Sequence, residues 1–535
     1  MSKKVAIIGA GASGLSGIKC CLDEGLEPVC YERTDHIGGL WRYTDDINDG
    51  QACVSRSTVI NTSKEMMCFS DFPIPKEFPI FMHNTYVYKY FNMYADRFGL
   101  KPYIHFHTEI VLISKADDFD QTGQWKVEIR DTKSRKTEIK IFDGVLVCTG
   151  HHAEKNIPSF NGLEDFRGKV LHSHDYKDTR GYENKRIVIV GIGNSGGDAA
   201  AELSRTASQV FLSTRRGSWL LNRVSDDGLP FDMLNTTRVA NFMISILPLW
   251  FLTRITLAKL RQRINHDLYS LTPKHGIFSQ HPLVNDDLPN RLACGSVVIK
   301  ADIKRITKTG VEFVDGTFED NIDVMFLATG YRFGFPFIDK SVIDVKENKA
   351  DLFKYMYPPQ LDKKTLAVIG YIQPLGAIMP IAELQCRLAC RVIKGDVKLP
   401  SASDMMADIH MKRCALDRRY VKSLRHTIQV DWIPYMDELA KLTGCMPNIK
   451  TKILTDPRLA YELIFGPGSP YQYRLRGHGK WDGARKAILT QWERTFYPLR
   501  TRDTGIRPGT SYWKHVCFFS IIGVIAYLAK LYEFF

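Results

Sequence analysis

One short segment constrains the fold of this chain more than any other: three glycines placed between an apolar strand and a helix. The apolar run 5–8 leads into the spacing Gly-x-Gly-x-x-Gly, formed by Gly9, Gly11 and Gly14. In a parallel α/β fold, the first glycine permits a tight turn, the second lets a pyrophosphate approach the backbone, and the third lets helix and strand pack closely. The unpaired N–H groups at the helix start favour an anion. The sequence therefore predicts a dinucleotide-binding unit here.

The residues that follow this turn indicate FAD as the dinucleotide. A second apolar strand at 28–31 ends in Glu32, whose carboxylate can accept hydrogen bonds from ribose hydroxyls. An acid at this place favours an adenosine without a 2′-phosphate. Gly39, Leu40 and Trp41 then form a second glycine turn, of the kind found in FAD-binding oxidoreductases. We expect both turns and Glu32 to contact FAD.

The same spacing recurs in the middle of the chain. After the apolar strand 187–190 it is formed by Gly191, Gly193 and Gly196. The next strand, 209–213, ends in Thr214 and Arg215 instead of an acid. A guanidinium group can pair bidentately with a 2′-phosphate, whereas an acid would repel it. The second turn therefore predicts NADPH, against the alternative that the arginine is simply solvated.

Two nucleotide-binding units in one chain imply a hydride relay from a nicotinamide to a flavin. The 535 residues are enough for two to four domains. The chemistry would then be that of the flavin, with the protein supplying binding and orientation. A disulfide reductase of similar architecture is disfavoured, because no CxxC or CxxxxC pair lies near either turn.

A further motif gives the chain a family resemblance. Between the two turns lies Phe166-x-Gly168-x-x-x-His172-x-x-x-Tyr176, which resembles the identifying motif of the flavin-dependent monooxygenases. With the two turns and the segments 60–67 and 328–331, the resemblance to the vertebrate flavin-containing monooxygenases covers essentially the whole chain. We expect the motif to act as a hinge or linker between domains, so His172 is not a candidate for catalysis.

The resemblance implies an α/β fold with two dinucleotide-binding, Rossmann-like domains, in which the NADPH domain interrupts the FAD domain. The implied boundaries are 1–154 and 332–445 for the FAD domain and 155–213 and 296–331 for the NADPH domain. A helical insertion at 214–295, a C-terminal region at 446–510 and a hydrophobic membrane anchor at 511–535 complete the chain. The insertion is expected to contact the membrane or form a substrate entrance.

The resemblance also implies site residues that the glycine spacing does not reveal. It places Asn61 and Gln373 beside the flavin, and Ser195 beside NADPH. Asn61 is the candidate catalytic residue, because its amide can both donate and accept hydrogen bonds and so hold a peroxide or the nicotinamide amide. It lies in a nominal glycosylation sequon, which a cytosolic domain would leave unmodified.

The implied reaction uses NADPH and O2 to form a C4a-hydroperoxyflavin, which oxygenates a soft nitrogen or sulfur atom. The substrates would be small lipophilic xenobiotics, amines or sulfides. Two alternatives stay open from the sequence: a Baeyer–Villiger monooxygenase acting on ketones, and an NADPH oxidase that releases hydrogen peroxide. Both would share the two cofactor turns.

Charge and hydropathy bear on partners. The net charge of +13 comes without a nucleic-acid recognition motif, so we expect no nucleic acid.

An apolar run at 516–529 with basic flanks resembles a tail anchor. A helix over this run reaches only about 21 Å, against about 30 Å of hydrocarbon, so spanning and one-leaflet insertion both stay open. We expect the endoplasmic reticulum (microsomal) membrane, with catalytic domains facing the cytosol; self-association is left open.

The run 242–252, broken by Pro248 and followed by basic residues, has two interpretations. It is either a core helix or a helix that lies on the membrane surface. We expect the membrane contact, because the run falls in the insertion and the C-terminal run already indicates a membrane.

Overall fold

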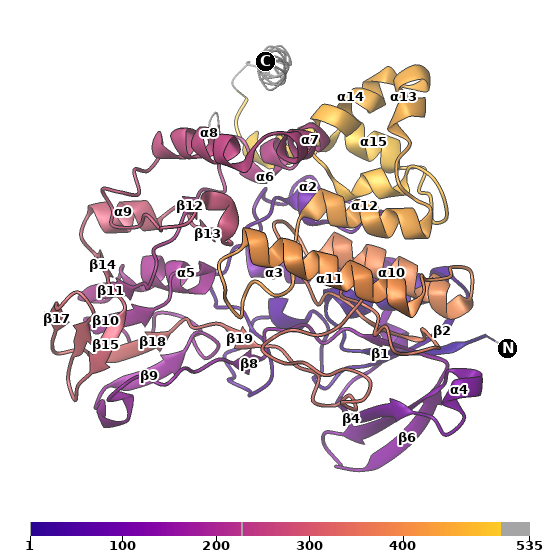
Figure 1. The fold of residues 1–535 in the computed structure, drawn as a ribbon, viewed down its shortest axis with the longest axis horizontal. Helices are drawn as coiled ribbons and strands as arrows, with labels where there is room; N and C mark the ends of the chain where they lie inside the picture. The colour runs from indigo at the N-terminus through magenta and orange to yellow at the C-terminus, as the bar shows by residue number, and fades with distance from the viewer. Residues whose placement is uncertain (1, 226–227, 504–535) are drawn as a thin grey trace.

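Two parallel sheets form the frame of the molecule in a computed structural model that describes residues 2–225 and 228–503 (Figure 1). The first sheet has the order β20-β7-β1-β2-β3 and the second the order β14-β11-β10-β18-β9. The strands of the first are β1 (Lys4–Ile8), β2 (Glu27–Tyr31), β3 (Ile104–His105), β7 (Gly144–Val147) and β20 (Leu366–Val368). Those of the second are β9 (Lys169–His172), β10 (Arg186–Val190), β11 (Gln209–Ser213), β14 (Val297–Lys300) and β18 (Val324–Leu327).

The central strands of both sheets read as continuous apolar runs because helices and other strands cover them. The four last residues of β1 and of β10 are buried, as are all four residues of β7 and of β18. The chain builds most of the first sheet, then the whole second sheet, and returns to add β20 beside β7. The expected α/β fold with two parallel, nucleotide-binding-type sheets is confirmed, while the domain boundaries stay a prediction.

Helices pack on the sheets as the glycine turns predict. A helix follows each turn directly: α1 (Ala12–Asp23) after β1, and α5 (Asn194–Leu203) after β10. On the first sheet, α10 (Met379–Lys394) packs against α1 and against α12 (Trp432–Thr443). The core there includes the fully buried Ile18, Cys386 and Leu388. The other helices of this part are α2 (Lys64–Met67), α3 (Asn84–Arg97), α4 (Phe119–Thr122) and α11 (Ala402–Arg419).

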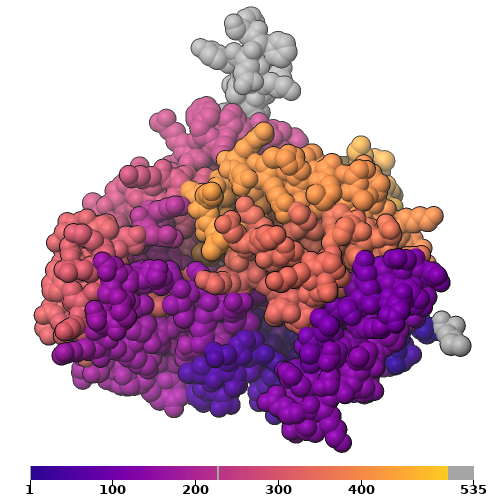
Figure 2. Space-filling view, turned by 60° about the horizontal axis from the view of Figure 1, so that its bottom comes forward, coloured from indigo at the N-terminus to yellow at the C-terminus, as the bar shows by residue number. Residues whose placement is uncertain are grey.

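A small antiparallel sheet covers one face of each parallel sheet. One consists of β4 (Thr108–Lys115), β5 (Trp125–Asp131) and β6 (Thr137–Phe142), and the other of β15 (Ile303–Ile306), β16 (Val311–Phe313) and β17 (Phe318–Glu319). Trp125 is fully buried where the first of these meets β7 and β20. Figure 2 shows this sheet (purple, at the right) as an outer edge of the molecule.

Short strand pairs join parts of the chain that are far apart in sequence. They are β8 (Glu154–Lys155) with β19 (Tyr331–Arg332), β12 (Leu220–Leu221) with β13 (Leu283–Val284), and β21 (Gln373–Pro374) with β22 (Gln429–Val430). The C-terminal region adds α13 (Ile449–Thr455), α14 (Pro457–Phe465), α15 (Ala484–Leu489) and α16 (Gln491–Phe496).

The insertion places its first three helices in a layer at the top of the view in Figure 1, whereas its last helix packs lower, against α5 and β14. It contains α6 (Phe231–Asn235), α7 (Arg238–Ile246), α8 (Leu249–Arg261) and α9 (Leu288–Ala293). The core-helix interpretation of the run 242–252 is wrong: α7 has no buried residue, and α8 buries only Leu260. Pro248 is the N-cap of α8, because a proline cannot continue α7.

Among residues 2–225 and 228–503, no helix is both long enough and apolar enough to span a bilayer. The anchor predicted at 511–535 lies outside the described residues. It therefore stays a prediction.

Candidate functional site

The first glycine turn has the geometry that its spacing requires. Gly9 adopts a φ of +97°, and its N–H donates to the Tyr31 carbonyl at 2.8 Å. A Cβ placed on Gly14 would lie 1.8 Å from the Gly9 carbonyl oxygen. No side chain fits there, so helix α1 can start directly against the end of β1.

The second glycine turn of the FAD motif faces the first one. A Cβ on Gly39 would lie 3.3 Å from the Cα of Gly11, and one on Gly11 would lie 3.7 Å from the Cα of Gly39. Gly39, Leu40 and Trp41 form a single 3₁₀ turn. Two backbones that approach without side chains form a cradle next to the N-terminus of α1, which fits the pyrophosphate of a dinucleotide.

Glu32 is fixed beside this cradle at the end of β2. Its Oε2 accepts from the Ala10 N–H at 2.8 Å, and its Oε1 accepts from the N–H and hydroxyl of Thr34 at 3.0 and 2.8 Å. The carboxylate is thus held where the fingerprint places an adenosine ribose.

The turn after β10 repeats this design. A Cβ on Gly196 would lie 1.9 Å from the Gly191 carbonyl oxygen, almost the distance found in the first turn. Gly193 is the N-cap of α5, and Ser195 is exposed in the first turn of that helix. Since the N–H groups in the first turn of a helix have no partner within that helix, this end of α5 can bind an anion.

Thr214 and Arg215 follow the end of β11, as the sequence predicts. The N–H of Thr214 donates to the Lys300 carbonyl at 3.0 Å, and its hydroxyl accepts from the Gly217 N–H at 3.1 Å. Arg215 is exposed, and no carboxylate of the described residues forms an ion pair with it. This is a suitable environment for a 2′-phosphate.

Asn61 contacts a residue that the sequence did not single out. Its Oδ1 accepts from the Nε of Arg223, in the insertion, at 2.9 Å. Arg223 in turn forms an ion pair with Asp286 at 3.2 Å. The acceptor of the Asn61 amide is thereby engaged, so its Nδ2 is the group that can donate to a reacting molecule.

A second contact from the insertion holds the same segment. Asp232, in α6, accepts from the N–H of Ser63 at 2.7 Å and from its hydroxyl at 2.9 Å. Burial raises the pKa of Asp232 to about 6. The backbone two residues after Asn61 is therefore fixed by a carboxylate that lies far away in the sequence.

Gln373 lies in β21 and is half-buried. With its amide oriented to satisfy both neighbours, it donates to the Arg425 carbonyl at 3.0 Å and accepts from the Nε of Arg425 at 3.2 Å. Sequence reasoning missed Arg223, Asp232 and Arg425, because none of them belongs to a spaced motif. No local signal marked them, because each acts through a contact that only the fold creates.

The contacts of the motif around His172 hold neighbouring segments of the backbone together. The His172 ring bonds through Nε2 to the Gly330 carbonyl at 3.0 Å, which ties β9 to the segment after β18. Burial lowers the pKa of His172 to about 4, so the ring is neutral at physiological pH. A Cβ on Gly168 would lie 2.5 Å from both the Phe166 ring and the Asp323 carbonyl oxygen, which explains the glycine.

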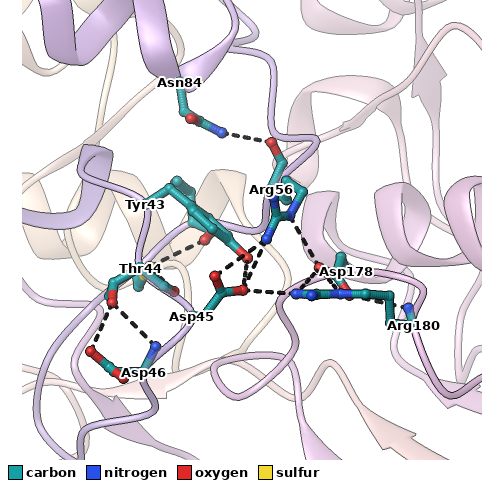
Figure 3. Close-up of polar contacts among 10 residues, drawn as sticks. Tyr43, Thr44, Asp45, Asp46, Arg56, Asn84, Asp178 and Arg180 are labelled. Carbon is teal, nitrogen blue, oxygen red and sulfur yellow. Dashed lines mark hydrogen bonds and ion pairs between the residues drawn. The ribbon is translucent and has the colours of Figure 1, made fainter.

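Beyond this motif, an ion-pair cluster joins the segment after the FAD turn to residues 178–180 (Figure 3). Arg56 bonds to Asp178 at 3.1 Å and to Asp45 at 3.0 Å, and Arg180 bonds to the same two carboxylates at 2.6 and 2.9 Å. The arginine hydrogen bonds lower the pKa of Asp178. The pairs are mostly exposed, so each contributes little alone, but together they hold the two segments to each other.

Comparison with known proteins decides the family. A family model described as FMO-like, flavin-binding monooxygenase-like, matches residues 2–533. The chain belongs to this family. The monooxygenase is 54% identical to "Flavin-containing monooxygenase 5" of Oryctolagus cuniculus over 504 residues, with 94% of each chain covered. It is 46% identical to "Dimethylaniline monooxygenase [N-oxide-forming] 2" of Cavia porcellus over 537 residues, with 100% of each chain covered.

Solved structures agree on the fold. The S-allyl-L-cysteine S-oxygenase of Allium sativum matches with a TM-score of 0.64 and 23% identity, over 93% of this chain and 99% of that one. OTEMO in complex with FAD and NADP matches with a TM-score of 0.61 and 16% identity, over 83% and 98%. The protein is thus a flavin-binding monooxygenase, and neither the Baeyer–Villiger nor the oxidase alternative is favoured.

Proposed function

We propose that this monooxygenase oxygenates a soft nitrogen or sulfur atom of small lipophilic xenobiotics, with NADPH as reductant and O2 as the oxygen source. The observation that carries the proposal is the contact between Asn61 and Arg223, which presents one amide donor beside the expected flavin position. Two relatives support the class of substrate atom: one is named N-oxide-forming and one S-oxygenase.

We assign FAD to the cradle between the first two glycine turns, with contacts from Gly9, Gly11, Gly14, Glu32, Gly39, Leu40, Trp41, Asn61 and Gln373. We assign NADPH to the turn after β10, with contacts from Gly191, Gly193, Ser195, Gly196, Thr214 and Arg215. Bound flavin supplies the activation of oxygen. The chain supplies binding, orientation and exclusion of water.

The role of Asn61 follows from its fixed orientation. Since Arg223 occupies the amide oxygen, the Nδ2 hydrogens are the part of the Asn61 amide that can donate to a reacting group. A donor that is already oriented needs no reorganisation during reaction, which is how such groups stabilise developing charge. Neither a side-chain nucleophile nor a general base is needed.

The test measures sulfoxide, ester and hydrogen peroxide in parallel reactions with two substrates. The full-length enzyme with NADPH, O2 and an aryl methyl sulfide should form sulfoxide in near-equal amount to the NADPH consumed. A cyclic ketone in place of the sulfide should give little ester, and little hydrogen peroxide should accumulate with the sulfide present. Ester as the main product, or peroxide equal to NADPH with every substrate, would contradict the proposal.

We also propose that α7 and α8 rest on the cytosolic surface of the endoplasmic reticulum membrane, together with the predicted anchor. Phe242 is 60% exposed and Trp250 69% exposed, on helices that bury almost nothing. Lys259 and Arg261 at the end of α8 suit anionic headgroups.

Deleting residues 511–535 tests this surface. The shortened enzyme should still sediment with vesicles that contain anionic lipid, and replacing Phe242 and Trp250 by serine should release it. Complete release on deletion of the tail alone would argue against the surface.

A further inference from the structure

Arg425 lies in a segment that follows α11 and contacts both β21 and the insertion. The segment follows α11 and leads into β22, which pairs with β21 in the register Gln373 to Gln429. The Gln373 N–H donates to the Ile428 carbonyl at 2.7 Å. On the other side, the Val421 N–H donates to the Ser279 carbonyl of the insertion at 2.9 Å. The backbone of the segment is therefore fixed at both ends.

The guanidinium group of Arg425 reaches both the second glycine turn and Gln373. Its Nη1 lies 3.2 Å from the position that a Cβ would take on Gly193, the N-cap of α5. Its Nε bonds to the Gln373 amide at 3.2 Å. A larger residue than glycine at position 193 would thus push against the guanidinium group.

The charge of Arg425 has no counter-charge within the described residues, where no carboxylate forms an ion pair with it. Burial lowers its pKa to about 10, which still leaves it positive. Its neighbours are imidazoles: burial, together with Arg425, lowers the pKa of His152 to about 4 and that of His281 well below its usual value. A half-buried cation among neutral groups is costly unless an anion joins it.

We propose that Arg425 binds the pyrophosphate of NADPH at the mouth of the second glycine turn. The turn places a pyrophosphate at the N-terminus of α5, and this is the end that Arg425 faces. The 2′-phosphate belongs at the end of β11, near Thr214 and Arg215. A guanidinium group can bind two phosphate oxygens at once, which a lysine cannot. The inference rests on the proposed assignment of this turn to NADPH.

The test uses the full-length, FAD-loaded enzyme and two nucleotides. NADPH and NADH share the pyrophosphate, but only NADPH has the 2′-phosphate. Arg425→Gln should raise the dissociation constants of both by about tenfold or more, since it removes a charge-assisted hydrogen bond. Arg215→Gln should raise that of NADPH alone. The dissociation constants come from the dependence of anaerobic flavin reduction on nucleotide concentration.

Matched controls exclude a merely structural effect. Lys422→Gln removes an exposed cation from the same segment and should change neither constant. FAD content and the midpoint of thermal unfolding should be the same in wild type and Arg425→Gln. If Arg425→Gln loses FAD, the dissociation constants of NADPH and NADH are measured for Arg425→Lys instead. This variant keeps the positive charge but cannot bind two phosphate oxygens at once.

The outcomes distinguish the role of Arg425 from the assignment of NADPH to the second glycine turn. Unchanged constants in Arg425→Gln, or weaker binding of NADPH but not NADH, overturn the inference while Arg215→Gln behaves as expected. If Arg215→Gln binds NADPH as tightly as wild type, the assignment of the second turn fails instead.

Discussion

At the scale of single residues, the candidate site depends on groups held by distant partners. Asn61 and Arg223 are separated by 162 positions in sequence, and Ser63 and Asp232 by 169. Each contact satisfies a polar group that would otherwise be left without a partner. Substitutions here should therefore change orientation as well as remove atoms.

Asn61 should couple NADPH use to product. Asn61→Leu removes the Nδ2 donor and the contact to Arg223, so product formed per NADPH should fall by about tenfold or more. The lost reducing equivalents should be recovered as hydrogen peroxide, measured alongside NADPH oxidation. Asn61→Asp keeps a partner for Arg223 but cannot donate. If Asn61→Asp stays fully coupled, the donor role is wrong.

Asp232 should make stability depend on pH. Its folded pKa, about 6, is raised above the unfolded value near 4 because burial disfavours the charge. The folded state therefore binds this proton more tightly, and the stability that it contributes is lost as pH rises from about 4 through about 6. Thermal unfolding of wild type and Asp232→Asn should differ in pH dependence within this window. Parallel curves would contradict the expectation.

At the scale of elements, each glycine turn sets how closely a helix starts against a strand. Gly14→Ala would drive a Cβ into the Gly9 carbonyl oxygen at 1.8 Å, so α1 must move. We expect a loss of at least about 1–3 kcal/mol of stability, the range for overpacking, together with loss of FAD. Bound flavin and the unfolding midpoint are the measurements.

Gly17→Ala in the same helix is the matched control. A Cβ there would make ordinary contacts, at 3.4 Å with Leu146 and 3.7 Å with Cys386. Since alanine favours a helix by about 1 kcal/mol over glycine, this variant should be neutral or more stable. Equal damage from both substitutions would show that the close approach at Gly14 is not the cause.

Some of these elements could be predicted from the sequence and others could not. The two turns, their strands and their helices were predictable because the glycine spacing and the apolar runs are local signals. The partner of Asn61 was not, because the contact with Arg223 exists only once the insertion has folded against the segment that carries Asn61. The exposure of α7 was also ambiguous, since an apolar helical face reads the same whether protein or lipid covers it.

At the scale of the whole molecule, the insertion contacts residues of both candidate cofactor sites and so connects them. Arg223 ties it to Asn61, and the Val284 N–H donates to Asn194 Oδ1, in the second turn, at 3.0 Å. A change in the insertion should therefore alter the chemistry without touching a glycine turn.

Arg223→Leu should reproduce part of the uncoupling of Asn61→Leu. The double variant should be no worse than the more severe single variant, because both remove the same contact. Asp286→Asn serves as control: it removes the ion pair of Arg223 but leaves the Asn61 bond. Additive losses of product per NADPH in the double variant would mean that the two residues act independently.

The late return of β20 to the first sheet has a consequence for the order of events during synthesis. The second sheet uses strands between residues 169 and 327, so it can close on the ribosome while the first still lacks an edge strand. The first sheet must wait until residue 368 has emerged. In a nascent chain stalled before that point, the fragment that contains the second sheet should resist protease. The strands of the first sheet should still be digested.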